Sequence, residues 1–310
     1  MSNFAAFTKS NHTFLEGLVF RGLKDNPLTS SSIFNISGRL VKLEYPAVMS
    51  IINLSPDSFY STSSVTEEEQ IEIRIREMIG EGVDILDIGA ASSKPGSKAI
   101  PVELETERIA KAVKIARQIS PEVLISVDTY RASVAAKALE LGASMINDIS
   151  AGLLDEAMVP LVQSAGVPYI IMHMRGTPED MNNAQNLMYN DLAADIIRFF
   201  AERIHFLHQH GIHQLIIDPG FGFSKNVQLN FELLRKLSLF QIIETPILVG
   251  LSRKSMIFKT LHLEPGLALN GSTAAHMIAL MNGADILRVH DVAEARETIA
   301  IFKAYKNQST

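Results

Sequence analysis

Residues 216–225 read Ile-Ile-Asp-Pro-Gly-Phe-Gly-Phe-Ser-Lys. The apolar start of this stretch is typical of a buried strand, and the strand ends on the carboxylate of Asp218. A Pro-Gly-rich turn follows at once. An Asp in such a position often only caps a turn by bonding its own backbone. Here it closes an apolar run, so we expect its oxygens at the mouth of a core, and the same arrangement recurs along the chain.

From residue 47 onward, apolar runs end on polar residues and are followed by a loop and an amphipathic segment. The eight runs are 48–52, 83–88, 123–127, 144–146, 169–172, 215–217, 247–251 and 286–287. The helix-like segments are 66–80, where Thr66 can cap the start, 103–119, 132–141, 155–165, 191–210, 229–237, 272–281 and 292–303. Near-continuous apolar strands with helices between them indicate a parallel sheet covered by helices.

Eight such units predict an α/β fold of the (β/α)8 TIM barrel type. A doubly wound sheet is the alternative, and the lack of a Gly-x-Gly-x-x-Gly motif after the first run argues against it. Residues 1–35 are interpreted as an N-terminal extension, an ordered arm or a flexible tail. Residues 36–310 are interpreted as a single barrel domain.

The composition argues against several classes of function. The formal net charge is −6 without a basic run, which argues against nucleic-acid binding but not against a small anionic ligand. The chain has no Cys, which excludes disulfides, thiolate metal sites and a Cys nucleophile, and which fits a cytoplasmic location. No apolar run approaches the roughly 18 residues of a membrane helix, so no membrane partner is expected.

In a barrel the carboxyl ends of the strands converge, so the polar residues that follow the runs should ring one mouth. Asp128, Asn147 and Asp218 suit a heterocycle that has an amino group beside a ring N–H, because a carboxylate accepts two bonds in a planar fork. A polar mouth hydrated by water is the other interpretation. Lys254, just past a strand, fits a role in fixing a ring or steering an anion, or is a flanking surface residue.

Arg288 and His290 are two residues apart, which places both side chains on the same face of a strand. With Asn53 and Lys94 they predict a site for an anion such as a pyrophosphate. Asn53 suits Mg²⁺, which takes few protein ligands. The alternative is a structural ion pair of Arg288 with Asp285 or Asp291. His173 fits a core histidine as well as a functional one.

Two long loops rich in small polar residues, 55–64 and 91–97, are candidate lids. Their serines have no Gly-x-Ser-x-Gly elbow and no assignable His or Asp partner, so a nucleophile role is not favoured.

Together these motifs resemble dihydropteroate synthase, the folate-pathway enzyme. The resemblance runs in order from about residue 36 to 303, with a motif on every strand. Its motifs are Asn-Leu-Ser-Pro-Asp-Ser-Phe (53–59), Asp-Ile-Gly-Ala-Ala-Ser-Ser-Lys-Pro-Gly (87–96), Ser-Val-Asp-Thr-Tyr (126–130), Ile-Asn-Asp-Ile (146–149), Met-His-Met-Arg-Gly-Thr-Pro (172–178), Asp-Pro-Gly-Phe-Gly-Phe-Ser-Lys (218–225), Gly-Leu-Ser-Arg-Lys-Ser (250–255) and Arg-Val-His-Asp-Val (288–292).

The resemblance implies a transferase that joins 6-hydroxymethyl-7,8-dihydropterin diphosphate to p-aminobenzoate, with Mg²⁺ as cofactor. It implies catalytic roles for Asn53, Asp128 and Lys254, with the metal at Asn53. The implied binding residues are Asp128, Asn147, Asp218 and Lys254 for the pterin, Asn53, Arg288 and His290 for the diphosphate, and Ser93, Lys94, Phe223 and Ser255 for p-aminobenzoate. It also implies a homodimer and a sulfonamide target.

Three departures from the family pattern affect the lids. The Asp-Gly-Gly that often follows the first-loop Phe is replaced by the run from Tyr60, so Ser61 stands where an acidic residue is common. Ser93-Lys94 replaces Thr-Arg, and a Lys lacks the planar fork of an Arg. Ser224 stands where Gly is common. These departures leave open a non-catalytic or altered-specificity pterin-binding paralogue. A pterin-dependent methyltransferase domain and a phosphate-binding barrel aldolase are less favoured alternatives.

Overall fold

The dominant element of the computed structural model, which describes residues 31–36, 38–54, 66–90 and 100–307, is an eight-stranded parallel sheet. Its strands lie in the order β8-β7-β6-β5-β4-β3-β10-β9. A parallel bridge between Ile217 and Ile247 joins the two end strands, so the sheet forms a nearly closed barrel. The strands are β3 (Ala47–Asn53), β4 (Ile85–Gly89), β5 (Leu124–Asp128), β6 (Met145–Asp148), β7 (Tyr169–Met172), β8 (Leu215–Asp218), β9 (Leu248–Val249) and β10 (Ile286–Val289). The predicted (β/α)8 barrel is confirmed.

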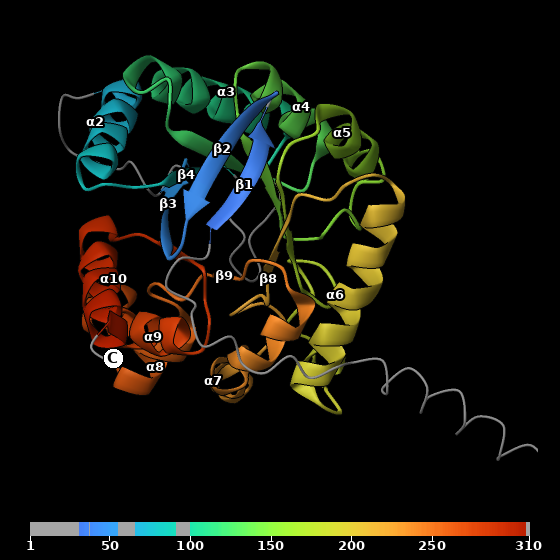
Figure 1. The fold of residues 1–310 in the computed structure, drawn as a ribbon, viewed down its shortest axis with the longest axis vertical. Coiled ribbons are helices and arrows are strands. Elements are labelled where there is room, and N and C mark those ends of the chain that lie inside the picture. The colour runs from blue at the N-terminus through green and yellow to red at the C-terminus, as the bar shows by residue number, and fades with distance from the viewer. Residues whose placement is uncertain (1–30, 37, 55–65, 91–99, 308–310) are drawn as a thin grey trace, which may run out of the picture. The chain divides into compact units, whose positions relative to one another are not determined.

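Helices surround the barrel (Figure 1). Thr66 caps α2 as predicted, because its side chain accepts a hydrogen bond from the Glu69 backbone and Glu69 reaches back to the Thr66 backbone. One short helix, α8, was not predicted. The helices are α2 (Glu67–Gly80), α3 (Val102–Ile119), α4 (Ala132–Glu140), α5 (Met158–Ala165), α6 (Leu192–Gln209), α7 (Val227–Arg235), α8 (Ser255–Leu261), α9 (Leu269–Met281) and α10 (Val292–Asn307), with short 3₁₀ turns η2 (Ala184–Leu187), η3 (Leu237–Ile243) and η4 (Pro265–Leu267).

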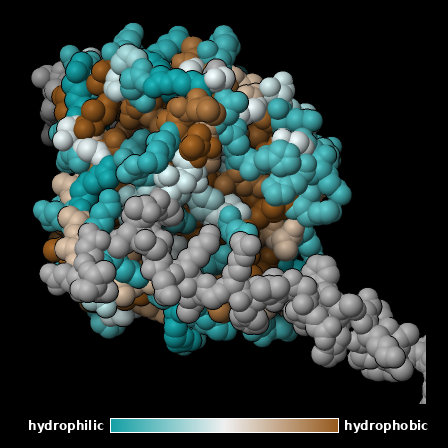
Figure 2. All heavy atoms as spheres, in the orientation of Figure 1, coloured by the Kyte–Doolittle hydropathy of each residue, from teal (hydrophilic) through white to brown (hydrophobic). Residues whose placement is uncertain are grey.

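An antiparallel hairpin of β1 (Ser31–Ile36) and β2 (Arg39–Glu44) precedes the barrel and lies across one end of it (Figure 1). Phe34, Leu43 and Tyr45 are buried against residues at the starts of the barrel strands. The hairpin therefore closes the amino-terminal end of the barrel. The boundary expected between residues 35 and 36 falls inside β1, because this strand is short and half polar and gives a weak sequence signal. The side shown in Figure 2 carries hydrophilic and hydrophobic side chains intermixed.

Alternate residues of the strands point into the barrel. The lower layers of the interior are apolar, with Met49, Ile85, Leu124, Met145 and Ile216 in one buried cluster. On β4, β5, β6 and β8 the next inward side chain is polar: Asp87, Ser126, Asn147 and Asp218. The polar groups therefore lie toward the carboxyl end. The hairpin and the apolar layers thus position a polar site at the opposite mouth.

Candidate active site

The predicted ring of polar residues lies at the carboxyl ends of the strands. Strand register places Asn53 beside Gly89, Gly89 beside Asp128, and Asp128 beside Asn147. Gly89 makes this packing possible, since a Cβ at that position would lie 3.1 Å from the Asp128 Cβ. Asp218 ends β8, and Asn147 and Asp218 are buried.

Arg288 is the centre of the site. Its Nε donates to Asp87 Oδ2 at 2.6 Å and its Nη2 donates to Asp128 Oδ2 at 2.6 Å. The alternative partners considered from the sequence are engaged elsewhere: Asp291 pairs with Arg253, and Asp285 accepts from a backbone N–H. Arg288 therefore belongs to the barrel interior and links β10 to β4 and β5.

Asp87 is a residue of this site that the sequence analysis did not single out. Its Oδ2 also accepts from Asn147 Nδ2 at 3.2 Å, so it holds both Arg288 and a residue expected to bind pterin. Its Oδ1 is buried and has no hydrogen-bond partner among the described residues. The available signal was that Asp87 stands between apolar residues, with Ile85 and Leu86 before it and Ile88 after it, because an unpaired charge is rarely buried in a strand.

The ionisable groups of the site have shifted pKa values. Burial raises the pKa of Asp128 to about 7, and the charge of Arg288 opposes this shift. Burial also raises the pKa of Asp218, opposed by Lys254. Conversely, burial lowers the pKa of Lys254 to about 8, with Asp218 opposing. Such opposed groups in one cluster are typical of a functional site.

Lys254 lies after β9, as predicted, and is the residue before the first turn of α8. Its Nζ donates to the carbonyl of Phe221 and lies 5.1 Å from the centre of the Phe223 ring. Gly222 allows the approach, because a Cβ there would lie 3.2 Å from Lys254 Cδ. Lys254 thus contacts the turn after β8 while its charge interacts with Asp218.

His290 lies past the end of β10, and its Nδ1 is 3.0 Å from Ser252 Oγ. Burial, together with the charges of Arg288 and Arg253, lowers the pKa of His290 to about 4. The imidazole is therefore neutral near pH 7, so it offers a hydrogen bond rather than a charge. The His290 carbonyl accepts from Arg74 of α2 at 2.8 Å, which ties this corner to the helix that follows the first candidate lid.

Of the predicted p-aminobenzoate residues, the structure describes Phe223, on the turn after β8, and Ser255, the first residue of α8. Ser93 and Lys94 lie outside the described residues, as do both candidate lids and Ser61. Ser224 is described, and its φ of +46° explains why Gly is common there. Its hydroxyl accepts from the Arg175 backbone at 3.0 Å and donates to Phe223 O, which stabilises the serine in this backbone conformation.

His173 is buried at the end of β7. Burial lowers its pKa well below the ordinary value, and the charge of Lys225 lowers it further. The ring of Phe199 meets it edge-on at 5.0 Å. These contacts fit the core interpretation of His173 as a neutral imidazole.

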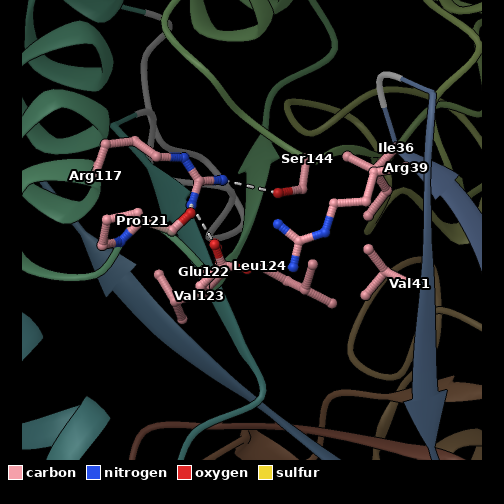
Figure 3. Close-up of a pocket in the computed structure, with 9 residues that line it drawn as sticks. All are labelled: Ile36, Arg39, Val41, Arg117, Pro121, Glu122, Val123, Leu124 and Ser144. Carbon is pink, nitrogen blue, oxygen red and sulfur yellow. Dashed lines mark hydrogen bonds and ion pairs between the residues drawn. The ribbon is translucent and has the colours of Figure 1, made fainter.

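A hollow at the other end of the barrel lies between the hairpin and the start of β5, where Arg39 and Arg117 point toward each other (Figure 3). Arg39 pairs with Glu122. The donors of Arg117 go to the carbonyls of residues 121, 123 and 142 and to Ser144. Both guanidinium groups are thus engaged in joining the hairpin and loops.

No described helix has the length and apolar character to cross a membrane.

Known proteins resemble this chain in sequence and in fold. Residues 49–290 match the family model described as pterin binding enzyme. The chain is 39% identical over 269 residues to dihydropteroate synthase of Escherichia coli K12, covering 86% of this chain and 94% of that one. Dihydropteroate synthase of Yersinia pestis, solved with a sulfonamide drug complex, is 36% identical with a TM-score of 0.82, over 89% of this chain and all of that one.

A third relative is dihydropteroate synthase of Xanthomonas albilineans, solved in complex with 7,8-dihydropteroate. It is 34% identical with a TM-score of 0.79, over 90% of this chain and 100% of that chain. The barrel, its charged mouth and these matches show that the chain belongs to the pterin binding enzyme family. Within that family it falls among the dihydropteroate synthases, which are transferases. The resemblance seen in the sequence is confirmed.

Proposed function

We propose that this protein joins 6-hydroxymethyl-7,8-dihydropterin diphosphate to p-aminobenzoate, forming 7,8-dihydropteroate and pyrophosphate. The observation that carries the proposal is the cluster of Asp87, Asp128, Asp218, Arg288 and Lys254 in one barrel mouth. The three carboxylates there can hydrogen-bond the polar edge of a pterin, and the two cations can bind an anionic group at the rim. The Escherichia coli and Xanthomonas relatives are both dihydropteroate synthases, and the Xanthomonas protein was solved in complex with 7,8-dihydropteroate.

The pterin would lie in the barrel with Asp218 and Asn147 on its amino-pyrimidine edge, Asp128 on another edge and Lys254 beside it. Charged hydrogen bonds of this kind contribute about 1.5–3 kcal/mol each, enough to select the ring. Arg288 donates one N–H to Asp87 and one to Asp128, and its guanidinium has five N–H donors, so the others would serve a diphosphate. His290 would add a neutral donor, and Asn53 lies at the same rim.

The covalent step exchanges one bond for another. The C–O bond between the pterin methylene and the diphosphate breaks, and its electron pair leaves with pyrophosphate. The lone pair of the arylamine nitrogen forms the new C–N bond, and that nitrogen then loses a proton. Carboxylates around the ring stabilise positive charge that develops on the pterin, an electrostatic contribution supplied by a preorganised site.

The residues present fit Mg²⁺ as cofactor. Asn53, at the end of β3, offers an amide oxygen, and Mg²⁺ commonly takes one or two protein oxygens beside substrate phosphates and water. Asn53 would be the protein ligand. When bound, the ion would supply charge stabilisation for the departing pyrophosphate.

The bond that breaks can be tested with substrate labelled by ¹⁸O in the oxygen bridging carbon and phosphorus. The proposal expects the label in pyrophosphate. Label retained on a hydroxymethylpterin product, with unlabelled pyrophosphate released, would show P–O cleavage and contradict this mechanism. Binding of the pterin diphosphate without any turnover would instead favour the non-catalytic paralogue.

Homodimer formation is also proposed, on a different observation. Neighbouring elements α8, η4 and α9 expose large apolar side chains, and such patches often mark protein interfaces. They are Leu261, Leu263, Leu267, Ile278 and Met281. Light scattering after gel filtration tests this: a mass near twice 34.1 kDa is expected, falling toward the monomer in Ile278→Glu.

The cytoplasmic location expected from the sequence stays a prediction.

A further inference from the structure

The turn after β8 is held from within by a buried ammonium group that the proposed reaction does not use. Lys225 is 4% exposed. Its Nζ donates to the carbonyl of Gly220 at 3.0 Å and to the carbonyl of Phe223 at 2.9 Å. The two contacts bracket the turn and fix its curvature from the inside.

A third contact ties this turn to the neighbouring strand. Lys225 Nζ lies 3.1 Å from His173 Nδ1. Burial lowers the pKa of Lys225 to about 7. In its ammonium form Lys225 has only donors, so Nδ1 of the neutral imidazole accepts this bond and the ring proton is on Nε2. An ammonium group has three donors, and all three are now used. Lys225 therefore has no donor left for a substrate, and any effect on the reaction must pass through other residues.

Two short paths lead from Lys225 to residues that face the substrates. The Gly220 backbone N–H donates to Asp218 Oδ1 at 2.8 Å, so the orientation of the pterin-binding carboxylate depends on the position of Gly220. On the other side, Lys225 holds the carbonyl of Phe223, whose ring lies beside Lys254. The same ammonium thus supports one residue from each half of the site.

We propose that Lys225 is a positioning residue: it holds the turn between Asp218 and Phe223 so that both substrates meet an ordered site. This role rests on the proposed function, since it assumes that Asp218 binds pterin and Phe223 lines the p-aminobenzoate site. A purely structural Lys225 would affect stability alone. A positioning Lys225 also affects the Michaelis constants of the folded enzyme.

The first variant is Lys225→Met, which keeps the apolar stem and removes the donors. In the full chain we expect binding of pterin diphosphate, measured by calorimetry, to weaken about 10-fold. This corresponds to the loss of about one charged hydrogen bond between the pterin and a misplaced Asp218. The KM for p-aminobenzoate should rise about 5-fold, a change smaller than the loss of a direct contact. Lys236→Met is the matched control, because that ammonium is paired with Glu232 on the surface, and it should leave both values unchanged.

The absence of Cys permits a chemical rescue. Lys225→Cys, alkylated in denaturant with 2-bromoethylamine and refolded, regains an ammonium at the end of a side chain of lysine length. Alkylation with 1-bromopropane gives the same length without donors. The proposal expects the aminoethyl form to recover most of the pterin affinity and the propyl form not to recover it. Unmodified wild type taken through the same cycle measures refolding losses.

Folded Lys225→Met with wild-type affinity and Michaelis constants would overturn the proposal. If that variant does not fold, His173→Phe decides, because it removes the ring nitrogens, and with them the Nδ1 acceptor of Lys225, and leaves both carbonyl contacts of Lys225. Pterin diphosphate should then bind about 3-fold more weakly, the loss of one neutral acceptor, and unchanged binding would overturn the role. Failure of the proposed function is distinguishable, because it would show as absent product with the wild type.

Discussion

Asp128→Asn removes one charge from the barrel mouth and changes little else. The variant keeps the volume of the side chain and its place beside Gly89. It replaces the ion pair with Arg288 Nη2, now 2.6 Å long, by a weaker hydrogen bond to a neutral amide oxygen, and it removes the carboxylate proposed to face pterin. A hydrogen bond to a charged group contributes about 1.5–3 kcal/mol, which corresponds to about 10- to 150-fold in an equilibrium or rate constant.

We therefore expect kcat/KM for pterin diphosphate to fall by about 10- to 150-fold in this variant, while the KM for p-aminobenzoate changes by less than about 3-fold. The assay follows pyrophosphate release at saturating p-aminobenzoate. Asp84→Asn is the matched control: Asp84 is also paired with an arginine, Arg296 at 2.7 Å, but lies before β4 at the opposite end of the barrel. It should keep wild-type kcat/KM.

The pH profile supplies a second readout. Because the pKa of Asp128 is raised to about 7, the charged form that accepts hydrogen bonds predominates only above that pH. The kcat/KM of the wild type should therefore fall as the pH drops below about 7. That limb should be lost in Asp128→Asn. A variant within 2-fold of the wild type, with the same pH profile, would refute the assignment of Asp128.

Three further predictions concern Lys254, Gly220 and Thr66. Lys254→Ala should lower kcat/KM by at least about 100-fold, since the ammonium makes charged contacts worth about 1.5–3 kcal/mol each; a steady-state assay showing less than a 5-fold loss would contradict its role. Gly220→Ala should cost at least about 3 kcal/mol in denaturant unfolding, because the Cβ would lie 2.1 Å from the His173 carbonyl at a φ of +75°. Thr66→Ala should cost about 1 kcal/mol in the same experiment through loss of the α2 cap, and equal stability of variant and wild type would count against the capping box.

Much of the barrel could be predicted because each strand carries its own local signal. The apolar runs and their polar ends located all eight barrel strands, and the mouth residues followed from the convergence of parallel strands. The β1–β2 hairpin was missed because its strands are short and half exposed. Helix α8 was missed because it is only seven residues long and begins at Ser255, the last residue of the motif at 250–255. Neither feature has the long periodicity on which such predictions depend.

Pairing inside the site could not be predicted. Arg288 bonds Asp87 and Asp128, which are 201 and 160 residues away in the chain, and nothing near Arg288 in the sequence selects them. The nearby Asp285 and Asp291 looked like better partners. Lys225 likewise stands in a quoted motif, but its burial and its three acceptors depend on how the turn folds against β7. Such contacts are set by tertiary packing.

The most direct test of the account is a turnover assay with purified protein, pterin diphosphate, p-aminobenzoate and Mg²⁺. It should measure pyrophosphate and 7,8-dihydropteroate in the same samples. The account predicts that the two products appear in equal amounts and that both are lost with Lys254→Ala. Tight binding of the pterin diphosphate without either product would contradict it and identify a pterin-binding protein that is not a synthase.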